Sequence, residues 1–360
     1  MPLDTDPLPQ IAATSVAFPK FKYPQDEIAA AFARHGGLSS ASVDRMVRLH
    51  KNSRVDTRYL AIPLEEYQSL DSLSRANDLY VEVGLELAER ALNDALSAAA
   101  LDASDVDLVV TTSSIGLAIP PLDAHLAQRL GFRSDIKRMP LFGLGCAGGA
   151  VGIARLHDYL RAYPDAVAVL LTLELNSLTV VPNRGTISFL VASGLFGDGV
   201  GAVVASGSNR PLAKPADRVK LVGSESRLYP DALHMTGARI GEDGFLMTIA
   251  PEIPKIVENN LGEAVTCFLK KHGLAIDDVA TWVSHTGGPR VLEAIQRAVS
   301  VPDAALSHSW DSMREAGNVS GTSVVDVLHR TLSCTPARNA PGLILSSGPG
   351  FSCEMVLVEY

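Results

Sequence analysis

The segment ALNDALSAAALDASDVDLVVTTSS, residues 91–114, has the pattern of a helix end, a turn and a β-strand. Apolar residues at helical spacing precede an acidic turn at Asp105-Val106, and β-branched residues follow it. The same order returns in AVTCFLKKHGLAIDDVATWVSHTG, residues 264–287, with Asp278-Val279 in the matching place. The offset is 173 residues throughout. This repeat indicates a chain built from two similar α/β halves.

Chance similarity between two common helix–turn–strand units is the alternative to duplication. The length of 360 residues favours duplication, because it suits two domains or two halves of one compact unit. The polar, proline-bearing stretch SGSNRPLAKPADR, residues 206–218, is a natural junction. We therefore predict an N-terminal half over residues 1–210 and a C-terminal half over 211–360.

Short β-branched runs and amphipathic stretches alternate along the chain, which is typical of layered α/β structure. We expect strands over residues 107–114, 166–175, 199–206, 281–287, 342–348 and 353–360. We expect helices over residues 78–99, with Asn77 as the cap, and over 148–163 and 290–299.

Composition excludes several function classes. The chain is 47% hydrophobic and 20% charged with a net charge of −9, and no run of Lys or Arg marks a nucleic-acid surface. The N-terminus is acidic and rich in proline, unlike a signal peptide, and no apolar run reaches the roughly 18–20 residues of a membrane span. We therefore expect a cytoplasmic protein that binds neither nucleic acid nor membrane.

The four cysteines are widely spaced, with no Cys-x-x-Cys pair and no matching pair of histidines. That spacing argues against a disulfide framework and against structural zinc, so we expect free thiols and no metal site. We expect three of the four, Cys267, Cys334 and Cys353, to be small packing residues.

Cys146 lies in LFGLGCAGGA, residues 141–150, where a strand or loop enters a helix. Unpaired N–H groups and the helix dipole at such a place favour a thiolate, and the flanking glycines admit a bound acyl group. A packing cysteine is an equally good interpretation of this position alone. His285 ends a strand before a Gly-Gly-Pro turn, and Asn318 lies in REAGNVSGTS between a helix and small residues. Singly, these two are an ordinary hydrogen-bonded histidine and a turn asparagine.

Taken together, Cys146, His285 and Asn318 have the residue types of a nucleophile, a base and a hydrogen-bond donor. The three sit in glycine-flanked junctions of the two halves, separated by 139 and 33 residues. Four further motifs accompany them, namely GLFGDGVGA (194–202), SHTGGP (284–289), EAGNVSG (315–321) and GPGFSCE (348–354). In this combination the chain resembles the type III polyketide synthases, the chalcone-synthase-like family, from residue 44 to its end.

The resemblance implies the thiolase fold, two related α/β halves in a layered αβαβα arrangement, and a homodimer. It also implies that acyl-coenzyme A loads Cys146 and that malonyl-coenzyme A is decarboxylated to an enolate. His285 and Asn318 would donate hydrogen bonds to the enolate oxygen, and the enolate would attack the cysteine-bound acyl group. The chain would grow by two carbons in each cycle and then cyclise. No cofactor is expected beyond these coenzyme A substrates.

The resemblance places further residues in the substrate pocket. Phe196 matches a gatekeeper phenylalanine, whereas Met247 stands where the second gatekeeper is aromatic. Ser346-Ser347 stand where the family often has Gly-Phe. These departures resemble the bacterial branch that takes fatty acyl starters and makes alkylpyrones or alkylresorcinols. The remaining pocket residues that the resemblance implies are Asn176, Thr179, Ala192, Ser320, Pro349 and Gly350.

Arg45, Arg48 and Lys51 match the basic entrance that holds the coenzyme A phosphates in this family. A phosphate-rich group entering a protein of net charge −9 needs a local positive patch. A solvated helix face is the alternative interpretation of the same three cations.

Other functions use the same residue types. A ketoacyl synthase that initiates fatty acid synthesis has a Cys, His and Asn set and performs a single condensation with carrier protein. A thiolase would need a second catalytic cysteine, for which Cys353 is the one candidate, inside a strand. A papain-like protease would carry a Cys-Gly-Ser-Cys-Trp type signature, which this sequence lacks. A non-catalytic binding protein on this fold would be expected to have lost one of the three residues.

Overall fold

The computed structural model describes residues 7–35, 38–179, 186–211, 219–241, 244–334 and 336–360. A nine-stranded mixed sheet runs through the molecule in the order β11-β12-β13-β8-β1-β7-β6-β4-β5. Two small antiparallel pairs, β2–β3 and β9–β10, lie outside it. The strands are β1 (Gln10–Ala17), β2 (Phe21–Pro24), β3 (Thr57–Leu60), β4 (Leu108–Ser113), β5 (Lys137–Phe142), β6 (Val167–Leu175), β7 (Asp198–Ser206), β8 (Val219–Leu228), β9 (Thr236–Gly241), β10 (Gly244–Ile249), β11 (Thr281–Ser284), β12 (Pro341–Gly348) and β13 (Ser352–Glu359).

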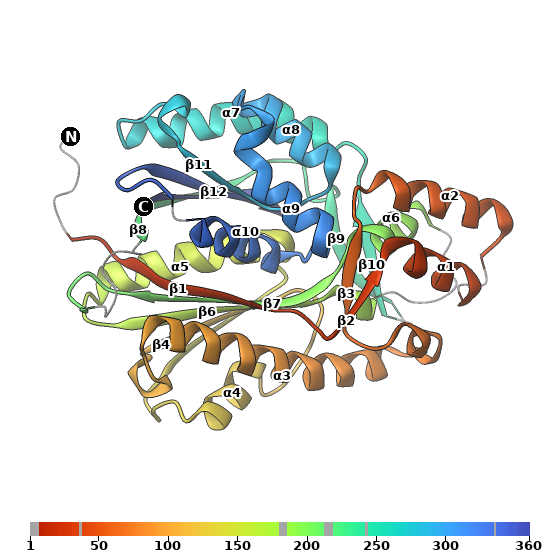
Figure 1. Ribbon diagram of the computed structural model, residues 1–360, viewed down its shortest axis with the longest axis horizontal. Helices are drawn as coiled ribbons and strands as arrows, with labels where there is room; N and C mark the ends of the chain where they lie inside the picture. Colours follow the sequence, from red (N-terminus) through yellow and green to blue (C-terminus); the bar gives the residue numbers. More distant parts are fainter. Residues whose placement is uncertain (1–6, 36–37, 180–185, 212–218, 242–243, 335) are drawn as a thin grey trace.

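The helices form three layers around this sheet (Figure 1). In that view α3 and α4 cover one outer face, α7 and α8 cover the other, and α5 and α10 lie between the two parts of the sheet. The helices are α1 (Gln25–His35), α2 (Ser40–Asn52), α3 (Leu73–Ala99), α4 (Leu122–Leu130), α5 (Gly148–Ala162), α6 (Ile187–Leu195), α7 (Ile253–Lys271), α8 (Pro289–Val299), α9 (Ser307–Ala316) and α10 (Gly321–Ser333).

The sheet has a mirror-like order about the contact between β1 and β8. On one side β1 pairs antiparallel with β7, β7 antiparallel with β6, and β6 parallel with β4. On the other side β8, β13, β12 and β11 repeat the same directions. Among the described residues, β1 and β8 pair at Gln10 with Lys220 and at Ile11 with Val219, and this contact joins two similar sheets. The structure therefore has the αβαβα layers that the sequence predicted.

The 173-residue repeat is confirmed in detail at the turns. Short 3-10 helices occupy Ala103–Asp105 and Ile276–Asp278. In the first, the Asp102 N–H donates to Asp105 Oδ2 at 3.0 Å, and in the second the Ala275 N–H donates to Asp278 Oδ2 at 2.8 Å. Each turn leads to a strand, β4 or β11, that starts at the matching residue.

The central strands and helices pack together in an apolar core. Every residue of β6 and β7 is buried, as expected for strands with helices on both faces. The middle layer is held by Ile153 and Leu156 of α5 packed with Val324 and Leu328 of α10 and with both sheets. The Cys146 segment starts in this layer, so its backbone is fixed by a well-packed core.

The expected strands and helices are present with shifts of a few residues at their ends, except that the 281–287 strand stops at Ser284. The predicted cap at Asn77 is wrong, because α3 begins at Leu73 and Ser72 accepts the Arg75 N–H at 3.2 Å. Asn77 instead bonds the N–H and carbonyl of Leu117 from inside the helix. Part of the predicted junction, residues 212–218, lies outside the described residues.

Candidate active site

Cys146 lies in a tight connection between β5 and α5. The chain leaves β5 at Phe142, forms a 3-10 turn over Gly145–Ala147 and enters α5 at Gly148. The predicted position at the start of a helix is therefore confirmed. Pro349 packs against this turn, since a Cβ on Gly145 would lie 2.6 Å from its ring. The Ser346 hydroxyl donates a hydrogen bond to the Cys146 carbonyl, so this departure from the family pattern holds the cysteine backbone.

A second helix start lies beside the first. A Cβ on Gly149, in the first turn of α5, would lie 2.2 Å from the carbonyl oxygen of Gly321, which begins α10. Only glycine permits so close an approach of the two backbones. The N-termini of α5 and α10 therefore converge, and the positive ends of both helix dipoles lie near one place.

Asn318 comes from the segment that enters α10. Its amide lies against the thiol, with Cys146 Sγ 4.0 Å from Oδ1 and 3.9 Å from Nδ2. The Ser320 N–H donates to Asn318 Oδ1 at 2.8 Å, which fixes the amide so that Nδ2 is the free donor. The structure thus brings together two residues that are 172 positions apart in the sequence.

His285 follows the last residue of β11, as predicted, and is 4% exposed. Neither ring nitrogen has a hydrogen-bond partner among the described residues. Burial lowers the pKa of His285 to about 3, against a smaller opposing effect of the Ser320 backbone. The imidazole is therefore neutral at physiological pH and can accept a proton at one nitrogen and donate one from the other.

Burial acts against the low thiol pKa that the sequence predicted for Cys146. Burial raises the pKa of Cys146 to about 12, and the carboxylate of Glu174 adds to this increase. Hydrogen bonds from Asn318 and Ser320 act in the opposite direction but are weaker. The expectation of a standing thiolate stays a prediction, which desolvation of the sulfur opposes and the helix dipole favours.

Glu174 and Ser114 are parts of this site that the sequence did not reveal. Glu174 is fully buried at the end of β6, and its Oε1 accepts a hydrogen bond from the Ser114 hydroxyl at 3.1 Å. Burial raises the pKa of Glu174 to about 8, and Ser320 and the Gly321 backbone oppose this. The only sequence signal was a lone acidic residue at the end of the apolar strand AVAVLLTLEL.

Replacing Glu174 with glutamine is expected to lower the pKa of Cys146. Glu174 raises that pKa through its negative charge, which is present above its own pKa of about 8, so removing the charge favours the thiolate. The pH profile of Cys146 alkylation by iodoacetamide should shift to lower pH in Glu174→Gln. Glu354→Gln is the control, because Glu354 is also buried and accepts a bond from a serine, Ser226. Identical profiles for wild type and Glu174→Gln would contradict this electrostatic effect.

A cavity of about 360 Å³ gathers several predicted pocket residues. Thr179, Ala192 and Met247 line it, whereas Asn176 is buried and donates to the Gly197 carbonyl at 2.8 Å. Phe196 directly follows α6 and is half-buried, and Ser320 acts on the pKa of both Cys146 and His285, through its side chain and its backbone respectively. Gly350, with φ +129°, shapes the turn between β12 and β13. The lining residues are Thr179, Thr186, Ser188, Phe189, Ala192, Arg239, Phe245, Leu246, Met247 and Thr248.

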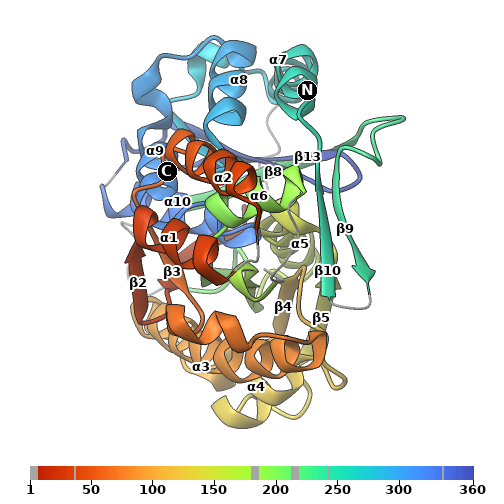
Figure 2. The same ribbon diagram turned by 90° about the vertical axis from the view of Figure 1, so that its right-hand side faces the viewer.

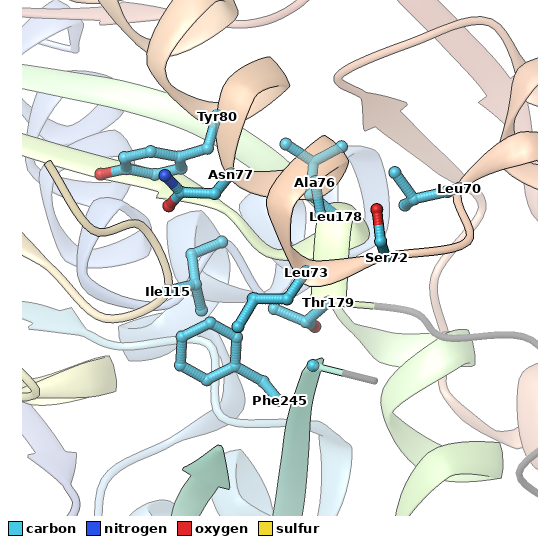
Figure 3. Close-up of a pocket in the computed structure, with 11 residues that line it drawn as sticks. Leu70, Ser72, Leu73, Ala76, Asn77, Tyr80, Ile115, Leu178, Thr179 and Phe245 are labelled. Atoms are coloured by element: carbon cyan, nitrogen blue, oxygen red, sulfur yellow. The ribbon is translucent and has the colours of Figure 1, made fainter. Parts of the chain in front are cut away.

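A smaller cavity shares Thr179 and Phe245 with the larger one. Its volume is about 20 Å³, room for roughly one water molecule. Figure 3 shows Leu73, Ile115 and Phe245 pointing into this space from different elements. A small, mostly apolar cavity therefore lies next to the large one, with Thr179 and Phe245 lining both.

Arg45, Arg48 and Lys51 lie on the exposed surface of α2. No described residue forms an ion pair with any of them, so their charges face solvent. Figure 2 shows α2 beside α6, and the two helices are in contact. Residues of α6 line the 360 Å³ cavity, which places the three cations on a neighbouring helix rather than in the cavity itself.

The other chemistry-bearing residues are separate from this site. All four cysteines are free thiols. Cys353 is buried as expected, but Cys334 is exposed at the end of α10, so its predicted packing role is wrong.

Within the described ranges, no group of three or more His, Cys, Asp and Glu residues is arranged to hold a metal ion. No helix among them is long and apolar enough to cross a bilayer.

Comparison with known proteins agrees with this geometry. Residues 7–209 match the N-terminal domain of the chalcone and stilbene synthases, and residues 220–360 match their C-terminal domain. The chain is 44% identical over 351 residues to 1,3,6,8-tetrahydroxynaphthalene synthase of Streptomyces peucetius subsp. caesius, covering 97% of this chain and 93% of that protein. It is 32% identical over 359 residues to a putative chalcone synthase of Bacillus subtilis (strain 168), covering 97% and 98%.

A solved structure has the same fold. The crystal structure of 1,3,6,8-tetrahydroxynaphthalene synthase from Streptomyces coelicolor A3(2), a bacterial type III polyketide synthase, superposes with a TM-score of 0.91. It is 28% identical in sequence, and the match covers 98% of this chain and 99% of that one. The chain therefore belongs to the chalcone and stilbene synthase family and is a type III polyketide synthase, a decarboxylating condensing acyltransferase of thiolase fold that acts on coenzyme A thioesters.

Proposed function

We propose that Cys146 is the nucleophile, and that His285 and Asn318 are the groups that serve decarboxylation and condensation. The observation that carries this proposal is the contact between the Cys146 thiol and the Asn318 amide, made where two helix N-termini converge. The buried neutral His285, with both ring nitrogens unpaired, completes the set.

In the loading step, His285 accepts the Cys146 proton as sulfur attacks the thioester carbonyl. The S–acyl bond to Cys146 forms, the acyl bond to coenzyme A breaks, and the proton leaves with the released coenzyme A thiol. Because burial disfavours the Cys146 thiolate, we propose that proton transfer to His285 accompanies the attack. The neutral imidazole is in the state that this transfer requires.

In the second step, malonyl-coenzyme A loses carbon dioxide, and the electron pair of the broken C–C bond becomes an enolate. Asn318 Nδ2 and a His285 N–H donate hydrogen bonds to the enolate oxygen. Asn318 Nδ2 is available because Ser320 fixes the other end of the amide. The enolate carbon attacks the acyl carbonyl on Cys146, releasing the thiolate and extending the chain by two carbons.

The starter acyl group is the next part of the proposal. Alkylpyrone or alkylresorcinol products, expected from the resemblance, need a long fatty acyl starter. The apolar side cavity beside Thr179 would receive such a chain, but Leu73 and Phe245 would have to move, because its volume is about 20 Å³. A naphthalene-type product primed by malonyl-coenzyme A is the second candidate. The 44% identity to a tetrahydroxynaphthalene synthase and the nearly closed cavity favour it.

Mass spectrometry of products made from malonyl-coenzyme A, with and without acyl starters of two to about sixteen carbons, tests this proposal. Pyrones or resorcinols from long starters support the alkyl product, and product from malonyl-coenzyme A alone supports the second candidate. A single condensation that needs a carrier protein would overturn both.

Phe245→Ala should raise the yield from long starters, because it removes a side chain that lines and narrows the small cavity. Unchanged starter preference in Phe245→Ala would contradict a role for this cavity.

We further propose that Arg45, Arg48 and Lys51 hold the coenzyme A phosphates and that substrate enters past α6. This is supported by their exposure on α2, where no described residue forms an ion pair with them. Free thiols at Cys146, Cys267, Cys334 and Cys353 suit a reducing compartment, and we propose the cytoplasm.

The division of the chain into two halves, at residues 210 and 211, stays a proposal, and the mirror order of the strands in the sheet supports it.

A homodimer is proposed from the free edge of the sheet. β5 is the last strand of the order, and no residue along it is fully buried. Leu117, Ile119 and Phe142 are 44%, 102% and 54% exposed beside this edge. An uncovered strand edge with apolar side chains is a site for pairing with a second copy. Sedimentation equilibrium should give twice the chain mass of 38.1 kDa, and a monomer would contradict the proposal.

A further inference from the structure

Arg58 is a buried arginine that the mechanism above does not use. It lies on β3 and is 1% exposed, the largest side chain among those that are fully buried. Its Nε donates to Gln25 Oε1 at 2.9 Å, Nη1 to the Phe196 carbonyl at 2.7 Å, and Nη2 to the Ser193 carbonyl at 2.7 Å. A buried cation costs free energy unless it is fully paired, so these bonds fix its position closely.

The carbonyls that Arg58 binds belong to the last turn of α6. The final carbonyls of a helix have no partner within the helix, and cations are favourable there. α6 has no basic residue of its own in its last turn. Gln25 contributes a second bond by donating from Nε2 to the Gly194 carbonyl at 2.6 Å. Arg58 and Gln25 together therefore fix the C-terminal end of α6, and Phe196 is the first residue after that end.

The segment that starts at Phe196 is also joined to Asn318. Phe196 and Asn318 form an isolated parallel bridge, in which the Asn318 N–H donates to the Leu195 carbonyl at 2.8 Å and the Gly197 N–H donates to the Asn318 carbonyl at 3.0 Å. The stem of Arg58 packs against the residue before Asn318, since a Cβ on Gly317 would lie 3.2 Å from its Cδ. Arg58 thus touches both strands of the bridge.

Asp198 holds the same segment from its other end. Its carboxylate accepts hydrogen bonds from the Ala61 N–H at 2.6 Å and the Ser177 N–H at 2.8 Å. Ala61 directly follows β3, the strand that carries Arg58. The segment from Phe196 to Asp198 is therefore fixed at both ends, by the Arg58 guanidinium at one and through the Asp198 carboxyl group at the other.

We propose that Arg58 is a positioning residue for decarboxylation, which sets the places of Phe196 and Asn318 relative to Cys146 through the end of α6 and the Phe196–Asn318 bridge. This inference rests on the proposed function of Asn318. Arg58 does not reach Cys146 itself, whose backbone is held by Ser346 and Pro349 from β12 and the turn after it. Loss of Arg58 should consequently impair malonyl decarboxylation and leave acyl loading nearly intact.

The groups that face Arg58 leave it charged at neutral pH. Asp198 and Tyr67 raise its pKa, and burial lowers it to about 10. His50, the third titratable group nearby, has a pKa lowered to about 3 by burial and by Arg58, so it is neutral. Its Nε2 bonds the Ser193 hydroxyl at 3.1 Å. Burial also keeps Tyr67 protonated by raising its pKa well above the usual value, whereas burial raises the pKa of Asp198 to about 7, so Asp198 is the neighbour of Arg58 that titrates near neutral pH.

The experiment compares two rates in the full-length enzyme. Loading is measured as the mass gain of Cys146 with an acyl-coenzyme A, and decarboxylation as carbon dioxide released from malonyl-coenzyme A. Arg58→Lys keeps the charge but loses the fork that binds both carbonyls. Gln25→Met removes the bonds to Gly194 and Arg58 together with a longer one to the Ser53 hydroxyl at 3.4 Å, and it serves if Arg58→Lys does not fold. Arg133→Lys is the control, because Arg133 pairs with Asp107 and Asp135 at the surface.

We expect decarboxylation to fall about 100-fold in Arg58→Lys, the scale of a 1 Å misplacement, with loading within about threefold of wild type. Gln25→Met should show the same split with a smaller loss, and Arg133→Lys should show none. Equal losses of both rates, in proportion to the folded fraction, would overturn the inference and leave the proposed function standing. A wild-type enzyme that neither loads nor decarboxylates would instead refute the proposed function.

Discussion

Cys146→Ala is expected to abolish acyl loading and to lower product formation by about four to six orders of magnitude. Alanine has no atom that can form the thioester, and no second thiol lies in the site. The nearest sequence rival, Cys353, is buried on β13. The measurement is the mass of the intact protein after incubation with an acyl-coenzyme A, together with product yield.

Cys267→Ala is the matched control, since Cys267 is half-buried like Cys146 but lies on α7, outside the site. It should load and condense at the wild-type rate. A Cys146→Ala protein that still gains one acyl mass and still condenses would show that another group is the nucleophile.

Asn318→Ala is expected to slow malonyl decarboxylation by about 100- to 1,000-fold, the usual cost of removing one donor to a developing oxyanion. Loading should change much less, because the carbonyl attacked in that step does not depend on Nδ2. Initial rates of carbon dioxide release and of Cys146 acylation, measured on the same preparation, separate the two effects.

Asn318→Asp gives a sharper form of the same test. It keeps the shape of the side chain and the acceptor for the Ser320 N–H, but it replaces the donor with an anion. Decarboxylation should be at least as slow as in Asn318→Ala, because like charges repel at the enolate. Equal losses of loading and decarboxylation in both variants would show that Asn318 does not serve the enolate.

Much of the fold was predictable because its signals are local. The repeat at residues 91–114 and 264–287 consists of a helix end, an acidic turn and a strand, each set by neighbouring residues. The structure reproduces it down to the bonds of Asp105 and Asp278 to the backbone. The start of α3 was missed because Asn77 is a good cap by type, whereas Ser72 caps the helix one turn earlier.

The sequence singles out the residues of the proposed site but not the electrostatics around them. Cys146, His285 and Asn318 lie at junctions that glycines mark in the sequence. The raised pKa of Cys146 depends on desolvation and on Glu174, which reaches the site from β6. Such effects arise from tertiary packing, so no pattern near residue 146 encodes them. Arg58 was missed for the same reason, since its partners come from α1 and from α6 and its end.

The most direct test of the whole account is the fate of carbon from malonyl-coenzyme A labelled with ¹³C at the methylene carbon and at the thioester carbonyl carbon. The account predicts one carbon dioxide released for each condensation, and products whose labelled carbon rises by two atoms for each extension. Cys146→Ala and Asn318→Ala should suppress that incorporation. Malonyl-coenzyme A returned unchanged, or carbon dioxide released with no labelled carbon in a longer product, would contradict the account.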